Sequence, residues 1–201
     1  MRKKLGVATF RLRRFGVAAF RLREFMSPSH RPPHIFTPDS LVFISASTID
    51  HTLIFNSNNE LNVLLAAFNE AIEKFAFEKH GWVFLPNHYH ILIKSAKSSS
   101  VPEFINHLHG KSSFLVNGLN NVKGRKIWYQ YWDSIIESEK EFYKHLNYIH
   151  HNPTKHRITK YMEKYQWSSY KYWETGIGRD GINECFEKYP IIDFTLVGDQ
   201  E

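Results

Sequence analysis

Cysteine is nearly absent from this 201-residue chain, since Cys185 is the only one. A single thiol cannot close an intrachain disulfide or supply a cysteine zinc cluster. Nor does any stretch approach the roughly 18 uninterrupted apolar residues of a membrane-spanning helix. Hydrophobic residues make up 42% of the chain and aromatic residues 15%, which is ample for one packed domain with extensions. We therefore expect a globular protein of the reducing cytoplasm, with no membrane partner.

Charge is distributed unevenly along the chain, whose net charge is +6. Residues 81–173 carry thirteen Lys and Arg against six Asp and Glu, whereas residues 174–201 carry two against seven. A basic central segment next to an acidic one favours a polyanionic partner at the centre of the chain.

The N-terminus contains a tandem repeat. GVATFRLRRF (6–15) is followed directly by GVAAFRLREF (16–25), identical at eight of ten positions. Ten helical residues turn through about 1000°, so the two copies share no helical face. We expect residues 1–25 to be translated repetitive DNA outside the fold, with the working protein beginning near Met26. A basic arm that helps to hold DNA is the alternative.

Apolar patterning predicts the order of strands and helices. Strands are expected at 41–47, 82–85, 88–94 and 127–136, and helices at 60–79, 101–119 and 139–152. The order β-α-β-β-α-β predicts an α+β fold with a ferredoxin-like antiparallel sheet and an added C-terminal helix that ends before Pro153. We divide the chain into the extension 1–25, a domain at 26–173 and an acidic tail at 174–201.

Two histidines interrupt the apolar strand PNHYHILIK (86–94). Alternation along a strand sends His88 and His90 to the same face, where two imidazoles can chelate a metal ion. Each could instead be a half-buried histidine bonded to a backbone carbonyl. His107 and His109 repeat the spacing, but two helical residues this far apart point about 200° from each other and cannot share an ion.

The predicted helix at 139–152 leads into a polar cluster, HLNYIHHNPTKH (145–156). Tyr148 and Asn152 are four residues apart and so lie on one helical face, with Lys144, His145 and His151 near them. A candidate nucleophile therefore lies beside an amide oxygen. Asn152 could instead end the helix and Tyr148 could pack in the core, and His151 is an alternative metal ligand.

Four motifs in this order carry a family resemblance: PNHYHILIK, IWYQYWDSII, NYIHHNPTK and YQWSSY. From about Arg31 to Trp173 the chain resembles the REP-associated tyrosine transposases, which are HUH single-tyrosine transposases of bacterial insertion sequences. The resemblance implies that His88 and His90 bind a divalent ion, that Asn152 completes the ion site, and that Tyr148 is the nucleophile of the added helix.

The resemblance also implies a reaction and a substrate. Tyrosine attack on single-stranded DNA forms a covalent phosphotyrosine, from which a 3′-hydroxyl later rejoins a strand. The bond energy is retained, so no nucleotide-binding loop is needed; Gly110-Lys111-Ser112 looks like the end of a P-loop, but Ile105 replaces its first glycine. The expected substrates are hairpins of repeated extragenic palindromes on the nucleoid, and the protein is expected to act as a monomer or homodimer.

Ligand chemistry alone leaves the metal open, because two imidazoles and an amide oxygen tolerate zinc, nickel or manganese. The resemblance points to Mg or Mn as the cofactor, with phosphate oxygen and water completing the coordination. Six basic residues are expected to contact DNA, the first two also favouring ionisation of the tyrosine: Lys144, Lys155, Lys94, Lys111, Arg125 and Lys126.

Two other functions fit the same residues. A ferredoxin-like module could hold single-stranded DNA or RNA without cutting it. A metallohydrolase could use water as the nucleophile, which would leave Tyr148 a bystander.

Overall fold

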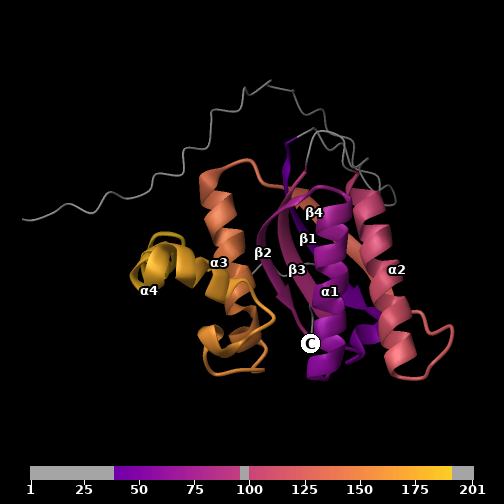
Figure 1. Cartoon of the computed structure of the whole chain (residues 1–201). Helices are drawn as coiled ribbons and strands as arrows, with labels where there is room; N and C mark the ends of the chain where they lie inside the picture. Colours follow the sequence, from indigo (N-terminus) through magenta and orange to yellow (C-terminus); the bar gives the residue numbers. More distant parts are fainter. Residues whose placement is uncertain (1–38, 96–99, 192–201) are drawn as a thin grey trace, which may run out of the picture. The chain divides into compact units, whose positions relative to one another are not determined.

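The computed structural model describes residues 39–95 and 100–191, which belong to one compact unit spanning 36–201. Its elements are coloured by sequence in Figure 1. The strands are β1 (Leu41–Thr48), β2 (Glu78–Phe84), β3 (His88–Lys94) and β4 (Trp128–Ile135). The α-helices are α1 (Asn58–Lys74), α2 (Val101–Leu119), α3 (Glu139–Lys155) and α4 (Tyr170–Lys188), and short 3-10 helices lie at Ile49–His51 and Met162–Lys164.

The strands form an antiparallel sheet in the order β2-β3-β1-β4. β1 lies between β3 and β4, so that Ser45 is opposite both His90 and Trp132. β1 and β3 are buried along almost their whole length, as expected of central strands covered on both faces. The order of elements and the pairing confirm the predicted α+β, ferredoxin-like class with an added helix.

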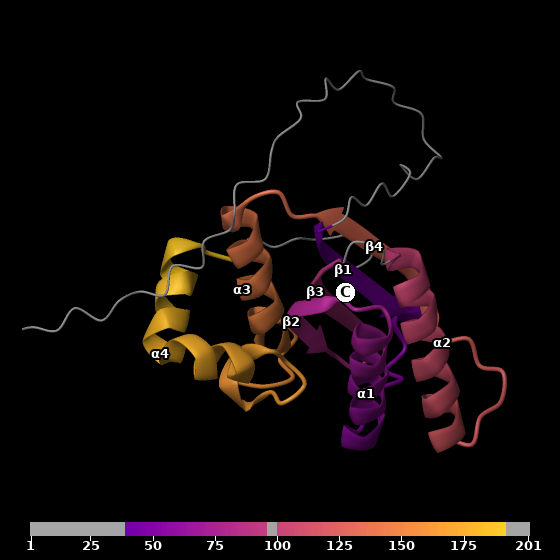
Figure 2. The same ribbon diagram turned by 45° about the horizontal axis from the view of Figure 1, so that its top comes forward.

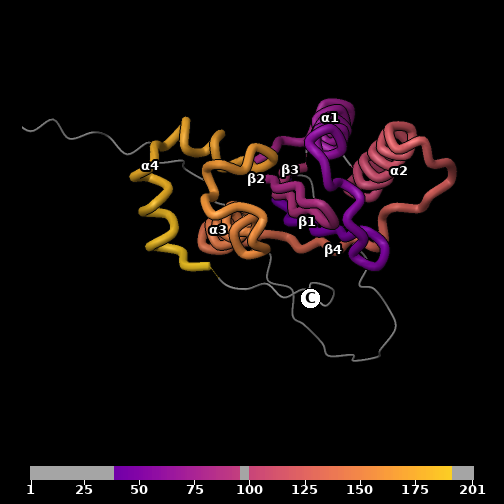
Figure 3. The backbone as a smooth tube through the Cα atoms, turned by 90° about the horizontal axis from the view of Figure 1, so that it is seen from below, coloured from indigo at the N-terminus to yellow at the C-terminus, as the bar shows by residue number. Residues whose placement is uncertain are grey.

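Helices cover the two faces of the sheet differently. Figure 3 shows α1 and α2 together on one side of the strands and α3 on the other, and Figure 2 shows α4 on the outer side of α3. Side chains of β3 alternate accordingly: the Tyr89 hydroxyl lies 2.8 Å from His109 Nε2 of α2, whereas His90 packs against Tyr148 of α3. The residues that face α3 are therefore the ones that can form a site with it.

Gly81 allows α3 to lie close to the sheet. A Cβ atom at this position of β2 would stand 3.0 Å from Leu146 Cδ1 and 3.2 Å from Ile149 Cδ1. Both distances are shorter than ordinary carbon contacts of about 3.5–4.0 Å. The missing side chain at residue 81 therefore determines how near Tyr148, which lies between the two α3 residues, comes to β3.

The predicted helix at 60–79 was wrong at its C-terminal end. α1 starts after Ser57, whose side chain accepts the Glu60 N–H while the Glu60 carboxylate accepts the Ser57 N–H, and it ends at Lys74. Ala76 then takes a left-handed conformation (φ 52°), and β2 starts at Glu78. The apolar residues Phe75 and Phe77 fit a helix and a strand equally well, which is why periodicity did not reveal the turn.

The expected stop at Asn152 was also wrong, because α3 continues through Pro153 to Lys155. Proline removes only its own N–H, and in the last turn this removes a single bond of the helix. The Asn152 carbonyl still accepts the His156 N–H at 3.1 Å, and the Pro153 carbonyl accepts the Ile158 N–H at 2.9 Å.

The C-terminal part differs from the expected acidic tail. α4 runs across the boundary expected at residue 173, and Gly178 kinks it with φ 75°. The repeat at 6–25 and the last ten residues of the predicted tail lie outside the described residues. No helix in the described ranges is long and apolar enough to cross a membrane.

Candidate active site

The two histidines of β3 lie on the face of the sheet that α3 covers. Their ring centroids are 5.2 Å apart, and the intervening Tyr89 points to the opposite face. His107 and His109 of α2 point in different directions, as predicted. His107 Nε2 lies 3.1 Å from Glu70 Oε1 of α1, while the His109 ring stacks on Trp128. Only the strand pair can therefore bind one ion together.

α3 brings Tyr148 and Asn152 to these histidines. The Tyr148 ring centroid lies 5.0 Å from that of His90, and Asn152 Oδ1 lies 3.2 Å from His88 Nε2. One helical turn separates Tyr148 from Asn152, and one strand repeat separates the histidines, so the two pairs meet across the helix-sheet interface.

Hydrogen bonds determine which nitrogen of His88 carries its proton. The Asn87 amide donates to the His51 carbonyl at 3.2 Å, which leaves Asn87 Oδ1 2.7 Å from His88 Nδ1. Since Oδ1 can only accept, Nδ1 carries the hydrogen and Nε2 presents a lone pair toward Asn152. Burial, and next the neighbouring imidazole of His156, lower the pKa of His88 to about 3, so this imidazole is neutral at physiological pH.

His90 is fully buried, and neither of its ring nitrogens has a hydrogen-bond partner among the described residues. Burial holds the pKa of His90 well below its usual value. An unpaired buried polar atom costs about 1–3 kcal/mol, so such atoms indicate a missing partner.

A divalent cation fits these donors. The Asn152 oxygen faces a nitrogen lone pair of His88, so two acceptors meet there. Rotating the Asn152 amide by 180° would give His88 a donor but would still leave both nitrogens of His90 unbonded. A cation can instead be bound by both imidazoles and the amide oxygen. No group of three His, Cys, Asp or Glu that could hold a metal occurs in the described part of the chain. Asn152 is thus the third protein ligand that the geometry offers, whereas His151 Nδ1 lies 2.9 Å from Thr154 Oγ1.

The two basic residues of α3 lie near the tyrosine. Lys155 Nζ lies 5.3 Å from the Tyr148 ring centroid. Lys144 is half-buried one turn before Tyr148 and so lies on the same side of the helix. Both lysines therefore lie on the Tyr148 side of α3.

The other four predicted basic contacts lie away from this cluster. Lys94 is at the opposite end of β3, about 20 Å along the strand from His88. Lys111 of α2 pairs with Glu70 at 2.9 Å on the other face of the sheet. Arg125 and Lys126 directly precede β4, and β1 separates that strand from β3.

Sequence reasoning missed the support that the C-terminal segment provides to α3. The Asn147 amide donates to the carbonyls of Cys185 and Tyr189 at 2.9 and 2.7 Å. His150 Nε2 lies 3.0 Å from Ser169 Oγ, which also accepts the Trp82 N–H of β2 at 3.1 Å. The motif YQWSSY was the available signal, although its spacing did not reveal this bridge from β2 to α3.

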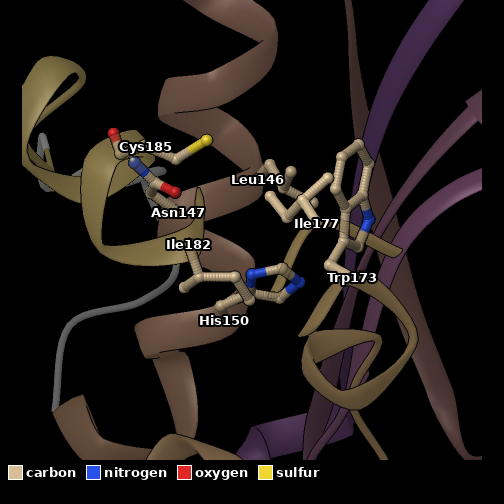
Figure 4. A pocket seen from close by; sticks show the side chains of 7 residues that line it. All are labelled: Leu146, Asn147, His150, Trp173, Ile177, Ile182 and Cys185. Carbon is tan, nitrogen blue, oxygen red and sulfur yellow. Dashed lines mark hydrogen bonds between the residues drawn. The ribbon is translucent and has the colours of Figure 1, made fainter. Parts of the chain in front are cut away.

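The interface between α3 and α4 leaves a cavity of about 10 Å³, lined by side chains that include Leu146, His150, Trp173 and Ile182 (Figure 4). This volume suits about one water molecule and excludes a nucleotide. The interface is therefore a packing contact that supports the helix of Tyr148. Tyr148, His90 and Asn152 are themselves at most 1% exposed.

The family profile described as "Transposase IS200 like" matches residues 46–152, slightly more than half of the chain and the whole stretch from the end of β1 to Asn152. The chain belongs to this transposase family. The match contains both histidines of β3 as well as Tyr148, so the family assignment and the cluster concern the same residues.

Individual relatives agree with the family. A Haemophilus influenzae protein, named as a candidate REP-associated tyrosine transposase, is 23% identical over 145 residues, which are 67% of this chain and 82% of the relative. The REP-associated tyrosine transposase of Escherichia coli K12 is 27% identical over 96 residues, 47% of this chain and 54% of the relative. These relatives confirm the resemblance inferred from the motifs.

The fold also matches a solved structure of a REP-associated tyrosine transposase bound to a REP hairpin. The TM-score is 0.61 at 19% identity, and the match covers 76% of this chain and 87% of the other. At this identity the match establishes the shared fold.

Proposed function

We propose that this IS200-like transposase cleaves single-stranded DNA and transfers strands through a covalent bond to Tyr148. The observation that carries the proposal is the position of the Tyr148 ring, 5.0 Å from that of His90 and on the helix that brings Asn152 to His88. A candidate nucleophile and candidate donors of a cation site thus lie in one cluster, in a chain that belongs to a transposase family.

The reaction divides into two balanced steps. The Tyr148 oxygen loses its proton and forms a bond to phosphorus, while the bond from phosphorus to the 3′-oxygen breaks and that oxygen takes up a proton. In the second step a 3′-hydroxyl attacks the phosphotyrosine and Tyr148 leaves as a phenol. Lys155, and Lys144 one turn away, favour the phenolate that forms in each step.

His88, His90 and Asn152 would hold Mg²⁺ or Mn²⁺, which when bound polarises a non-bridging phosphate oxygen and stabilises transition-state charge. The contact from Asn87 Oδ1 to His88 Nδ1 keeps the second nitrogen of His88 available as a ligand. Because Tyr148 and its neighbours are buried, DNA reaches the phenol only after the site opens.

The proposed substrates are hairpins of repeated extragenic palindromes with unpaired flanks. Two relatives carry REP in their names, and the solved structure with the same fold holds a REP hairpin. The basic balance of residues 81–173 supports a nucleic-acid partner for this chain.

The Tyr148→Phe variant tests the mechanism with a labelled hairpin and Mn²⁺. Nicking and the covalent protein-DNA band should disappear while DNA binding persists, because only the attacking oxygen is lost. Tyr143→Phe is the matched control, since Tyr143 lies on the same helix but stacks on Tyr189 at 4.9 Å. Continued nicking by Tyr148→Phe would indicate attack by water, and binding without any covalent band in the wild type would indicate a binding module.

A further inference from the structure

A groove at the C-terminal end of α2 combines exposed apolar side chains with a basic loop. It has a volume of about 430 Å³ and is lined by Phe114, Leu115, Asn117, Gly118, Val122 and Lys123, among others. Phe114 is 76% exposed and Val122 39% exposed. Contiguous exposed apolar side chains in soluble proteins often mark a binding surface, and this volume falls in the range of small-ligand sites.

The charge around the groove has one sign. Lys123, Arg125 and Lys126 lie four to seven residues after the end of α2, and residues 104–132 contain no Asp or Glu. An exposed aromatic ring beside lysines and arginines suits unpaired nucleotides, whose bases stack on the ring while phosphates meet the cations. The same charges disfavour a second copy of this basic region as the occupant.

Arg125 adds an unsatisfied donor to this loop. Its Nε donates to Asn117 Oδ1 at 2.9 Å, and the Asn117 amide donates to the Arg125 carbonyl at 2.8 Å, which together hold the loop against α2. Its Nη2 is screened from solvent and has no hydrogen-bond partner among the described residues. Arg125 therefore fixes the loop whose residues Val122 and Lys123 line the groove.

The loop lies at the end of the sheet that carries His88. The Ile49 N–H donates to the Ile127 carbonyl, and the Thr48 N–H donates to the Asn87 carbonyl, each at 2.8 Å. The starts of β4 and β3 therefore flank the end of β1, about 10 Å apart at the usual strand spacing. Gly124, which lines the groove, is three residues from Ile127, so a single strand that leaves the candidate active site at this end of the sheet can continue toward the α2 side.

We propose that this groove is a second DNA contact that binds one unpaired nucleotide flanking the hairpin. The base stacks on Phe114, and an adjacent phosphate meets Lys123, which lines the groove. The proposal rests on the proposed function only for the class of ligand, single-stranded DNA, and does not require cleavage. The α2-β4 loop would thus bind the unpaired flank of the hairpin, while α3 provides the nucleophile Tyr148.

The test measures DNA binding by fluorescence anisotropy in a Tyr148→Phe background, which cannot form the covalent bond. Phe114→Ala should weaken binding of a hairpin with unpaired flanks by about 5- to 150-fold, the usual effect of losing one base stack. Binding of the same hairpin without flanks should be unchanged, and Phe114→Trp should keep the affinity for the flanked form. Lys123→Gln should reduce the salt dependence of binding by about one phosphate contact.

Tyr172→Ala is the matched control, because Tyr172 is 62% exposed on α4, which packs against α3. Its affinity for the flanked hairpin should equal that of the parent. Equal affinity of Phe114→Ala and its parent for the flanked hairpin would overturn the proposal, as would an equal loss for hairpins with and without flanks. Nicking is assayed separately with Tyr148 present, so a failed cleavage mechanism and a failed groove give different results.

Discussion

Replacing Gly81 with valine should displace α3 from the sheet and thereby separate Tyr148 from His90. At this position a Cβ alone would stand 3.0 Å from Leu146 Cδ1 and 3.2 Å from Ile149 Cδ1. Ordinary carbon contacts are about 3.5–4.0 Å, so the helix has to retreat by about 0.5 Å or both side chains have to leave their rotamers. The two γ-methyl groups of valine increase the overlap.

The expected cost follows from the burial of the neighbours. Leu146 and Ile149 are at most 2% exposed, and the cavity of about 10 Å³ beside Leu146 is too small to take a displaced leucine side chain. Overpacking of this kind lowers the free energy of unfolding by about 1–3 kcal/mol. In a domain of this size the melting temperature should fall by about 2–12 °C. A shift near 1 Å at a reacting group can reduce the rate about 100-fold, so nicking should fall more than stability suggests.

The assay compares nicking of a flanked hairpin with urea unfolding for Gly81→Ala and Gly81→Val. The alanine variant should show a smaller loss of nicking than the valine variant. Gly110→Ala is the matched control, because a Cβ at Gly110 of α2 meets nothing within 4 Å. Alanine in a helix interior should stabilise the protein by about 0.5–1 kcal/mol and leave nicking unchanged.

One outcome would refute the reasoning. If Gly81→Val loses stability as expected but nicks at the wild-type rate while folded, the spacing between α3 and β2 does not control the reaction. The distance from Tyr148 to His90 would then have no catalytic meaning in this conformation.

Three further predictions concern single side chains. Ser169→Ala leaves the Trp82 N–H and His150 without their shared buried partner, and thermal unfolding should show a loss of about 1–3 kcal/mol. Calorimetry should show that Mn²⁺ binds His90→Ala at least 10-fold more weakly than wild type, and a normal affinity would contradict the assignment of His90 as a ligand. Burial lowers the pKa of His109 in the folded protein to about 3. As the pH falls below about 6.5, the unfolded chain protonates this histidine while the folded chain does not, so the free energy of unfolding decreases. Between pH 7 and 5 this one histidine should lower the free energy of unfolding by about 2 kcal/mol, so the loss that urea titrations show over this range should be smaller by about that amount in His109→Gln, while His88 and His150 contribute to both proteins.

Local sequence was sufficient for several elements. β3 and α2 have the predicted bounds, 88–94 and 101–119, because a dense apolar run and a well-spaced amphipathic pattern each fit one kind of structure. The shared face of His88 and His90 followed from alternation along the strand alone. α4 was missed because Gly176, Gly178 and Gly181 interrupt a segment with little apolar periodicity.

The sequence determined the identity and local spacing of the site residues, because the positions of neighbours on one strand or one helix depend only on backbone geometry. Tertiary structure decided that α3 covers the histidine face and places Asn152 beside His88 and Tyr148 beside His90. It also decided that Lys111 lies on the other face of the sheet, paired with Glu70. The position of α3 depends on packing between segments more than fifty residues apart, through the contact of Gly81 with α3 and the bond from Trp82 to Ser169, and no local pattern records such contacts.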